Sequence, residues 1–321
     1  MASVKFSRAL YDFEAFLDVE KNLSPRTRRA YVYDLERFAD HWIRRNKRNP
    51  TLDHIGPEDI KRYLEHLRMD RNYKSTTLSR TIASIRVFFG FCVMQGAIEA
   101  SPAAHIHNPK TPRKLPVFLV ESELKSLLRA PAADEREKQE ASREDYRNLP
   151  ARDYALLVVL AFTGVRLTEL IGLNLGDVDF ERMNIRVLGK GSKERIIPLN
   201  ETVIQALRSW LEVRTSPPDV ESVFVNRYGK VFSARGIEKL VERYVRKSGI
   251  SKGGISPHKL RHTFATLLHV SGVDIVEIQA LLGHSSITST QVYTHTSSVK
   301  LKSAVKKLDE ISWGQRAAEE R

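Results

Sequence analysis

The sequence predicts a mainly α-helical protein of two domains, the second of which carries a small antiparallel β-sheet. Apolar residues recur at helical spacing along most of the 321 residues. Four prolines within 102–116 interrupt that pattern, and residues 178–199 switch to short alternating runs. We therefore expect domains over residues 1–108 and 118–321, joined by a linker over 109–117.

The first domain is predicted to be a bundle of four amphipathic helices. Apolar stripes start near Phe6, after Ser24, after Gly56 and at Leu78. Serine and glycine are common just before a helix, and the proline that follows two of them suits the first helical position. Short polar turns join the stripes, which is typical of a small bundle.

The polar faces of these helices are basic. Residues 26–48 hold eight Arg or Lys against three acids, residues 61–86 hold seven against two, and the whole chain carries a net charge of +13. Such a face is either a solvated surface or one that contacts the phosphate backbone of a nucleic acid. Both interpretations stay open from charge alone.

Composition excludes several classes of protein. A single cysteine, Cys92, excludes a disulfide framework and a multi-thiolate metal site, and its apolar surroundings in the sequence favour plain packing. Asp177 and Asp179 lack an obvious third carboxylate, so we interpret them as structural. We find no glycine-rich nucleotide loop, no signal peptide and no apolar run of about 18 residues. We expect a cytoplasmic protein with no cofactor, metal or membrane partner.

The second domain is predicted to be helical on both sides of one hairpin. In the hairpin, short apolar strands flank a glycine-rich turn at 189–193. The charged run 134–147 has no apolar stripe, so we expect an exposed helix or loop without chemistry. Helices are expected at residues 121–129, 154–162, 202–213, 237–247 and 299–311.

One candidate site begins at a predicted helix start. Ser256 suits the N-cap and Pro257 the first helical position. His258 and Arg261 are three residues apart, which places both side chains on one helix face. A second helix, 274–282, ends at Gly283, a residue suited to a left-handed cap.

Two further groups follow this cap, His284 at once and Tyr293 nine residues later. With His258 and Arg261 they form a set suited to chemistry at a phosphate. Upstream, Arg166 follows a glycine break beside a buried helix. A charge there is costly without a partner, so either Glu169 or an anion is expected to pair with it, or both.

Five segments together resemble the tyrosine recombinase (phage-integrase) family, and Xer-type members are the most similar. They are TGVRLTEL at 163–170, GKGSKER at 189–195, PHKLRH at 257–262, LGH at 282–284 and VYTH at 292–295. All five occur in order with compatible spacing. The resemblance covers the second domain, whereas over the first it rests on the four-helix pattern.

The resemblance implies a two-domain, C-shaped DNA clamp: an N-terminal SAM-like core-binding domain and a catalytic domain. It implies that DNA strands are cleaved and rejoined through a 3′-phosphotyrosyl intermediate, without ATP. The implied catalytic residues are Tyr293 as nucleophile, His258 as general base or acid, Arg166 and Arg261 on the phosphate, Lys190 as proton donor to the leaving oxygen, and His284 as a phosphate donor or support. Glu169 would orient an arginine.

Further basic residues are predicted to contact DNA. They are Arg26, Arg28, Arg29, Arg80, Lys193, Arg195 and Arg235. Lys193 and Arg195 are assigned to the DNA backbone or to solvent. The resemblance also implies a homo- or hetero-tetramer on two double-stranded recombination sites, with a DNA translocase as a candidate regulator.

Three alternative functions remain. A relaxing topoisomerase uses similar phosphotyrosyl chemistry, and a non-enzymatic DNA-binding protein would need none. The same enzyme could also serve mobile-element integration or plasmid resolution rather than resolution of chromosome dimers. Sequence alone leaves the target site and the docking of the last helix, within the protomer or on a neighbour, undecided.

Overall fold

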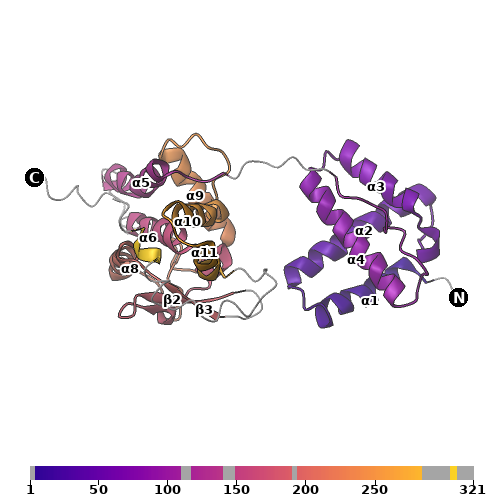
Figure 1. Cartoon of the computed structure of the whole chain (residues 1–321), viewed down its shortest axis with the longest axis horizontal. Helices are drawn as coiled ribbons and strands as arrows, with labels where there is room; N and C mark the ends of the chain where they lie inside the picture. The colour runs from indigo at the N-terminus through magenta and orange to yellow at the C-terminus, as the bar shows by residue number, and fades with distance from the viewer. Residues whose placement is uncertain (1–3, 110–116, 140–148, 190–193, 284–303, 309–321) are drawn as a thin grey trace, which may run out of the picture. The chain divides into compact units, whose positions relative to one another are not determined.

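The chain divides into two compact units, residues 1–114 and 115–321 (Figure 1). The computed structural model describes residues 4–109, 117–139, 149–189, 194–283 and 304–308. Each unit has its own hydrophobic core. The predicted linker, 109–117, lies largely outside the described residues.

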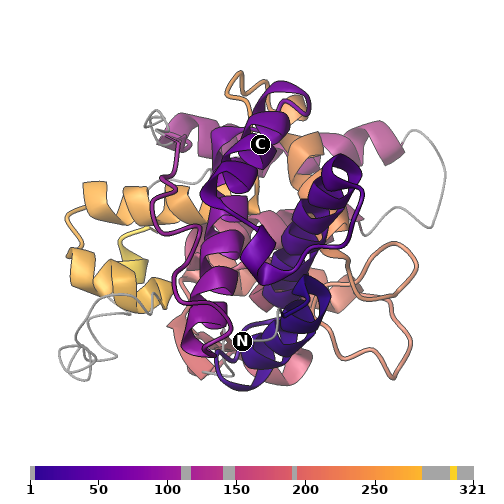
Figure 2. The same cartoon turned by 90° about the vertical axis from the view of Figure 1, so that its right-hand side faces the viewer.

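The first unit is the predicted four-helix bundle. Its elements are α1 (Phe6–Val19), α2 (Pro25–Asn46), the 3-10 turn η1 (Leu52–His54), α3 (Pro57–Met69) and α4 (Ser75–Met94). Ser24 caps α2, since its side chain accepts a hydrogen bond from the Thr27 amide at 3.3 Å. Figure 2 shows the same bundle from a second side.

Aromatic rings fill the core of this unit. Phe13, Phe38, Phe88 and Phe89 are fully buried, and the centroids of the Phe13 and Phe88 rings lie 5.4 Å apart in an edge-on arrangement. The helix α4 supplies two of these rings. It is long and apolar enough to span a membrane by length and composition, contrary to our expectation, but half of its apolar window is buried inside the protein. A core helix passes the same test.

The second unit is built around α6 (Leu149–Thr163), most of whose side chains are buried. It packs against α5, α8 and α10 (Figure 1). The other helices are α5 (Glu121–Gln139), α7 (Leu167–Ile171), the 3-10 turn η3 (Leu175–Asp177), α8 (Glu201–Val213), α9 (Ala234–Lys247), α10 (Pro257–Val270) and α11 (Ile275–Leu282). Because α6 runs through the core, packing fixes the position of its C-terminal end, from which the chain continues to α7.

The helix α5 is longer than predicted. We expected it to end at Arg129, but it continues through Pro131 to Gln139. Pro131 removes one backbone hydrogen bond, yet Pro131 itself is buried, so packing holds the helix together there. The charged run 134–147 therefore begins as helix, and residues 140–147 lie outside the described residues.

The sheet has three antiparallel strands in the order β1-β2-β3. They are β1 (Val178–Asp179), β2 (Asn184–Leu188) and β3 (Glu194–Pro198). In the hairpin, Ile185 pairs with Ile197 and Val187 with Arg195, so Arg195 shares the sheet face of the buried residues. The predicted fold class, mainly helical with a small antiparallel sheet, is confirmed, while the turn 190–193 lies outside the described residues.

One helical turn is described near the C-terminus, at 304–306, within the predicted helix 299–311. Ala304, Val305 and Leu308 are buried in the core of the second unit. This described part therefore contributes to the core of the second unit.

Candidate active site

A glycine break turns the chain sharply at the C-terminal end of α6. Gly164 adopts φ +61°, and a Cβ placed there would lie 2.6 Å from a ring carbon of Phe264 and 2.8 Å from Leu282. Only glycine fits both the left-handed backbone and this close packing. The turn places Arg166 at the N-cap of α7.

Glu169 holds Arg166 by two contacts. Its carboxylate accepts hydrogen bonds from the Arg166 backbone amide at 2.7 Å and from the guanidinium Nη1 at 2.8 Å. Its side chain is only 1% exposed. The predicted pairing of these two residues is therefore present in the folded protein.

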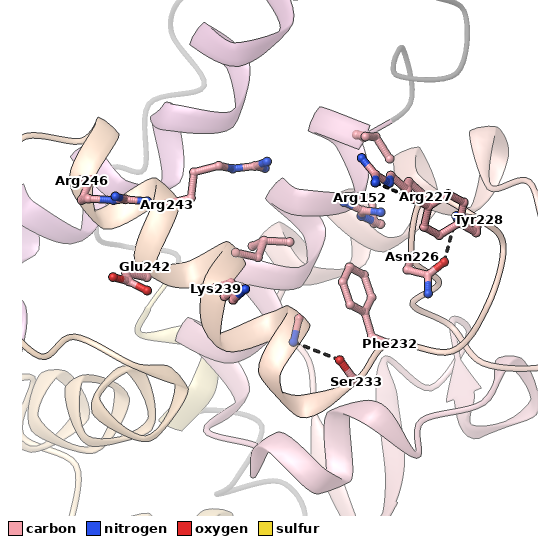
Figure 3. Close-up of a pocket in the computed structure, with 13 residues that line it drawn as sticks. Arg152, Asn226, Arg227, Tyr228, Phe232, Ser233, Lys239, Glu242, Arg243 and Arg246 are labelled. Carbon is pink, nitrogen blue, oxygen red and sulfur yellow. Dashed lines mark hydrogen bonds between the residues drawn. The ribbon is translucent and has the colours of Figure 1, made fainter.

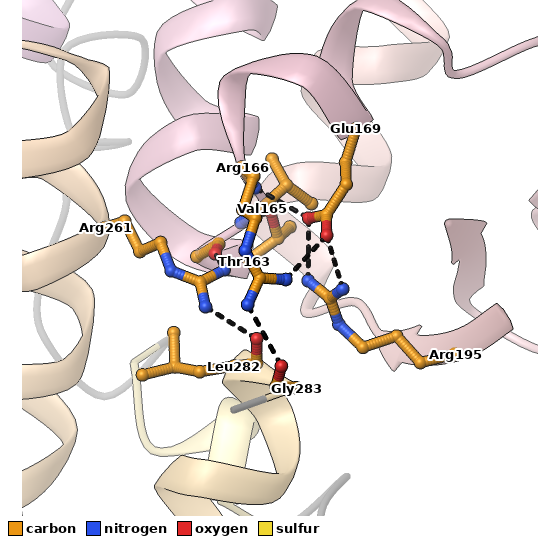
Figure 4. Close-up of polar contacts among 9 residues, drawn as sticks. Thr163, Val165, Arg166, Glu169, Arg195, Arg261, Leu282 and Gly283 are labelled. Carbon is orange, nitrogen blue, oxygen red and sulfur yellow. Dashed lines mark hydrogen bonds and ion pairs between the residues drawn. The ribbon is translucent and has the colours of Figure 1, made fainter. Parts of the chain in front are cut away.

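Arg261 comes to the same place from the buried side of α10. It donates hydrogen bonds to the carbonyl oxygens of Gly164 and, at 2.6 Å, of Leu282. Arg166 donates to the next carbonyl, that of Gly283, at 3.0 Å. The two guanidinium groups thus bind consecutive carbonyls at the end of α11 (Figure 4), directly before His284 in the sequence.

Arg195 is the member of this cluster that sequence reasoning placed elsewhere. We assigned it to the DNA backbone or to solvent, but both of its terminal nitrogens pair with Glu169, at 2.6 and 2.8 Å (Figure 4). Its side chain is 15% exposed. Alternation along β3 explains this direction, because Arg195 is two residues from Ile197, which the structure shows to be buried.

The cluster contains three guanidinium groups and one carboxylate. Burial alone would raise the pKa of Glu169, but hydrogen bonds from Arg195 and from both groups of Arg166 lower it to about 2. Burial, together with the charges of Arg166 and Arg195, lowers the pKa of Arg261 to about 10. Three guanidinium groups against one carboxylate leave the cluster with a surplus of positive charge.

Of the remaining predicted catalytic residues, the structure describes His258 alone. His258 is exposed in the first turn of α10, one turn before the buried Arg261. Lys190, His284 and Tyr293, together with Lys193, lie outside the described residues. The neighbouring His262 has its Nδ1 3.4 Å from the Thr266 hydroxyl.

The predicted DNA-contact residues of the first unit fall into two groups. Arg26 and Arg29 are exposed at the start of α2. Arg28 pairs with Asp18 at 2.5 Å, and Arg80 pairs with the buried Asp34 at 2.6 Å. Among the described residues, no carboxylate lies within ion-pair distance of Arg26 or Arg29. Their charge is therefore not offset in the way that the charges of Arg28 and Arg80 are.

Arg235, also predicted to contact DNA, is exposed in the first turn of α9. Beside it lies a basic pocket between α6 and α9, lined among others by Arg152, Lys239 and Arg246 (Figure 3). Arg152 in this pocket is already engaged, because it pairs with the fully buried Asp153 at 2.6 Å. Part of the pocket's positive charge is therefore structural.

Among the described residues, no cluster of three or more His, Cys, Asp or Glu side chains could hold a metal ion. Asp177, considered above as a possible carboxylate pair with Asp179, accepts hydrogen bonds from Arg186 and from the Asn174 amide. These contacts give it a structural role at the start of the sheet.

Two family models match the two units. The model of the phage integrase family matches residues 118–299, and that of the phage integrase N-terminal SAM-like domain matches residues 10–96. The chain is 36% identical to tyrosine recombinase XerC of Pelotomaculum thermopropionicum, covering 92% of this chain and 96% of the relative. It is 37% identical to tyrosine recombinase XerD of Staphylococcus epidermidis, covering 89% and 93%.

Solved structures share the fold. The XerH site-specific recombinase bound to palindromic difH substrate, in a post-cleavage complex, is 24% identical with a TM-score of 0.68, covering 90% of this chain and 82% of that chain. A lambda integrase dimer bound to a COC′ core site is 20% identical with a TM-score of 0.64, covering 88% and 96%. The family models and the curated relatives show that the chain, with this fold, belongs to the phage integrase family of tyrosine recombinases.

Proposed function

We propose that the protein is an Xer-like site-specific recombinase, which cleaves and rejoins double-stranded DNA through Tyr293. The observation that carries this proposal is the convergence of Arg166 and Arg261 on the consecutive carbonyls of Leu282 and Gly283. Fixed guanidinium groups with a surplus of positive charge suit the non-bridging oxygens of a phosphodiester. Each such preorganised donor contributes roughly 3–4 kcal/mol to stabilising a transition state.

In the proposed reaction, the Tyr293 oxygen forms a bond to the scissile phosphorus, and the bond from phosphorus to the 5′-oxygen breaks. His258 accepts the phenol proton, which is otherwise held with a pKa of about 10. Lys190 donates a proton to the departing 5′-oxygen. His284 donates a hydrogen bond to the phosphate. The phosphotyrosyl ester preserves the bond energy, so a 5′-hydroxyl from a second site can reverse the step and join new strands.

Basic residues of each unit are proposed to contact the DNA duplex. Arg26, Arg29 and Arg235 are exposed and suit contacts with the phosphate backbone. Four protomers, of one or two kinds, would assemble on two sites, and a DNA translocase would suit regulation of the exchange. We expect this to take place in the cytoplasm, on the chromosome.

The chemistry is tested with a nicked suicide duplex, selected from a random library for binding to the full-length protein. Wild-type protein should form a covalent adduct that migrates slowly in denaturing gels, and Tyr293→Phe should form none. Tyr293→Phe should still bind the duplex as tightly as wild type. Equal adduct from Tyr293→Phe, or none from wild type on a duplex that it binds, would overturn the proposal.

Recombination between two sites is tested separately with a supercoiled plasmid that carries two copies of the selected site as direct repeats. Site-specific exchange yields two smaller circles. Relaxation of supercoils without exchange would instead assign the chain to the topoisomerase alternative. Exchange between one chromosomal and one element-derived site, with none between two identical sites, would favour mobile-element integration.

A further inference from the structure

Arg195 reaches the arginine cluster because of strand register. In β3 its side chain lies on the same face as Ile197, which is buried against the core, and opposite Val187 of β2. The next residue along, Ile196, is 65% exposed. The hairpin therefore directs a charged side chain inward at a position close to its turn.

The contact that Arg195 makes is a two-point one. Its Nη1 and Nη2 donate to the two different oxygens of Glu169, at 2.6 and 2.8 Å. This bidentate geometry fixes the orientation of the carboxylate as well as its charge. Because Glu169 also accepts from the Arg166 backbone and guanidinium, the orientation of Arg166 depends on Arg195.

The stem of Arg195 also packs against the turn that ends α11. A Cβ placed on Gly283 would lie 2.8 Å from Cδ of Arg195. The same glycine has φ +61°, and its carbonyl accepts from Arg166. One side chain thus contacts both the carboxylate that orients Arg166 and the residue before His284.

We propose that Arg195 is a positioning residue, which holds the hairpin, the Glu169 carboxylate and the Gly283 turn in one arrangement and so fixes Arg166 for the phosphate. It acts through Glu169, with no DNA contact of its own. The proposal rests on the proposed cleavage reaction for its kinetic consequences. Its structural consequences are measurable without DNA.

The kinetic test compares Arg195→Met with Arg186→Met. Arg186 is a matched control because it lies on the neighbouring strand, pairs with Asp177 at 3.0 Å, and is 54% exposed. Arg195→Met should slow adduct formation at saturating duplex by about 10–100-fold, with the Kd for the duplex within about twofold of wild type. Arg186→Met should match wild type in both. A weaker Kd with a shallower salt dependence, and an unchanged rate, would show that Arg195 contacts DNA instead.

A double-mutant cycle tests the route through Glu169. If Arg195 acts through this carboxylate, Arg195→Met should add little to the fall in rate already caused by Glu169→Gln. If the double variant instead shows the product of the two single falls in rate, the two residues act independently and the proposal is overturned. Arg195→Lys keeps the charge without the two-point geometry, so it should recover only part of the rate.

The pH profile adds a readout that a merely structural role would not move. In wild type the pKa of Glu169 is lowered to about 2, so the carboxylate stays ionised throughout the working range. In Arg195→Met the carboxylate keeps Arg166 and the charge of Arg261 but loses one cation that opposes the effect of burial, so the pKa of Glu169 rises from its wild-type value. Protonation of Glu169 at low pH should then release Arg166. The ratio of the wild-type rate to the Arg195→Met rate should grow as the pH falls toward the ordinary pKa of a glutamate, about 4.3, and Arg195→Lys should restore the wild-type profile. A constant ratio would count against the proposal.

Hydrogen exchange of the free protein separates this inference from the proposed reaction. The Arg166 amide, which donates to Glu169, should exchange faster in Arg195→Met than in wild type or Arg186→Met. An unchanged rate would overturn the positioning role even if cleavage is never observed. Failure of wild type to form an adduct, with accelerated exchange in Arg195→Met, would reject the reaction alone.

Discussion

A buried carboxylate holds an arginine in each unit, Asp34 in the first and Glu169 in the second, and the two carboxylates differ in the number of their hydrogen-bond donors. In the first unit Asp34 accepts from Arg80 at 2.6 Å and from the Ser84 hydroxyl at 3.0 Å. In the second, Glu169 accepts from two guanidinium groups and one backbone amide. Burial raises the pKa of Asp34 despite its partners, whereas the partners of Glu169 lower its pKa to about 2.

This difference separates a neutral ion pair from a cluster with a surplus of positive charge. Asp34 and Arg80 neutralise each other, so they leave no charge for a ligand. Around Glu169, three arginines face one carboxylate, and positive charge remains beside the carbonyls of Leu282 and Gly283. The surplus of cations, rather than the presence of an ion pair, is what suits a phosphate.

The largest effect is expected from Arg261→Lys in the second unit. An ammonium group cannot donate to the Gly164 and Leu282 carbonyls and also offer a fork to a phosphate. Adduct formation on the suicide duplex should fall about 10²–10³-fold, with a smaller change in the Kd for the duplex. Arg129→Lys, at an exposed position on α5, should behave as wild type. If the two variants have similar rates, the cluster around Glu169 is not the phosphate site.

The turn that carries this cluster can be tested by adding one methyl group. Gly164→Ala forces both a left-handed alanine and an overlap with Phe264 and Leu282, so we expect the free energy of unfolding to fall by about 3 kcal/mol. Gly249 has a similar φ, +71°, but nothing within 4 Å of the added carbon, so Gly249→Ala should cost only about 1 kcal/mol. Urea denaturation measures both, and equal effects would show that packing at Gly164 is unimportant.

The pair in the first unit should respond in stability rather than in cleavage. Arg80→Ala leaves Asp34 buried with the Ser84 hydroxyl but without its guanidinium partner, which should cost about 2 kcal/mol in the free energy of unfolding. Arg80 is 41% exposed, so in the variant water takes over part of its role as a hydrogen-bond donor to Asp34. The double variant Asp34→Ala, Arg80→Ala should be more stable than Arg80→Ala alone. Additive losses of stability from the two single substitutions would contradict the interpretation of Asp34 and Arg80 as a neutral pair. A large fall in duplex binding by Arg80→Ala would contradict it as well.

Local signals made most of the fold predictable. Ser24 before Pro25, Gly56 before Pro57 and Gly283 after Leu282 mark helix ends that the structure reproduces. The pairing of Arg166 with Glu169 was also predictable, because the two residues are three positions apart across a helix start. Contacts within one turn of a helix join residues that are close in the sequence, so the sequence pattern predicts them.

Non-local pairings were not predictable in the same way. Ile196 and Ile197 are adjacent and both apolar, so the sequence leaves open which of them points inward, and that choice decides whether Arg195 faces solvent or Glu169. Arg80 meets Asp34 across two helices, a contact that no spacing rule indicates. Both arginines were therefore predicted to contact DNA, because their sequence neighbourhoods are basic.

The smallest effect is expected where guanidinium charge lies exposed on the first unit. Neutralising Arg26 and Arg29 together should weaken binding to every duplex equally and make the slope of log K against log salt concentration shallower by about 0.9 for each phosphate that the protein no longer neutralises. Arg28→Ala should change the slope less, because Arg28 is held by Asp18 at 2.5 Å in the free protein and must exchange that partner for a phosphate. Fluorescence anisotropy across a salt series measures this slope for wild type, for the Arg26 and Arg29 double variant and for Arg28→Ala. A larger slope change from Arg28 than from the exposed pair would mean that ion pairing in the free bundle does not decide which arginines contact DNA.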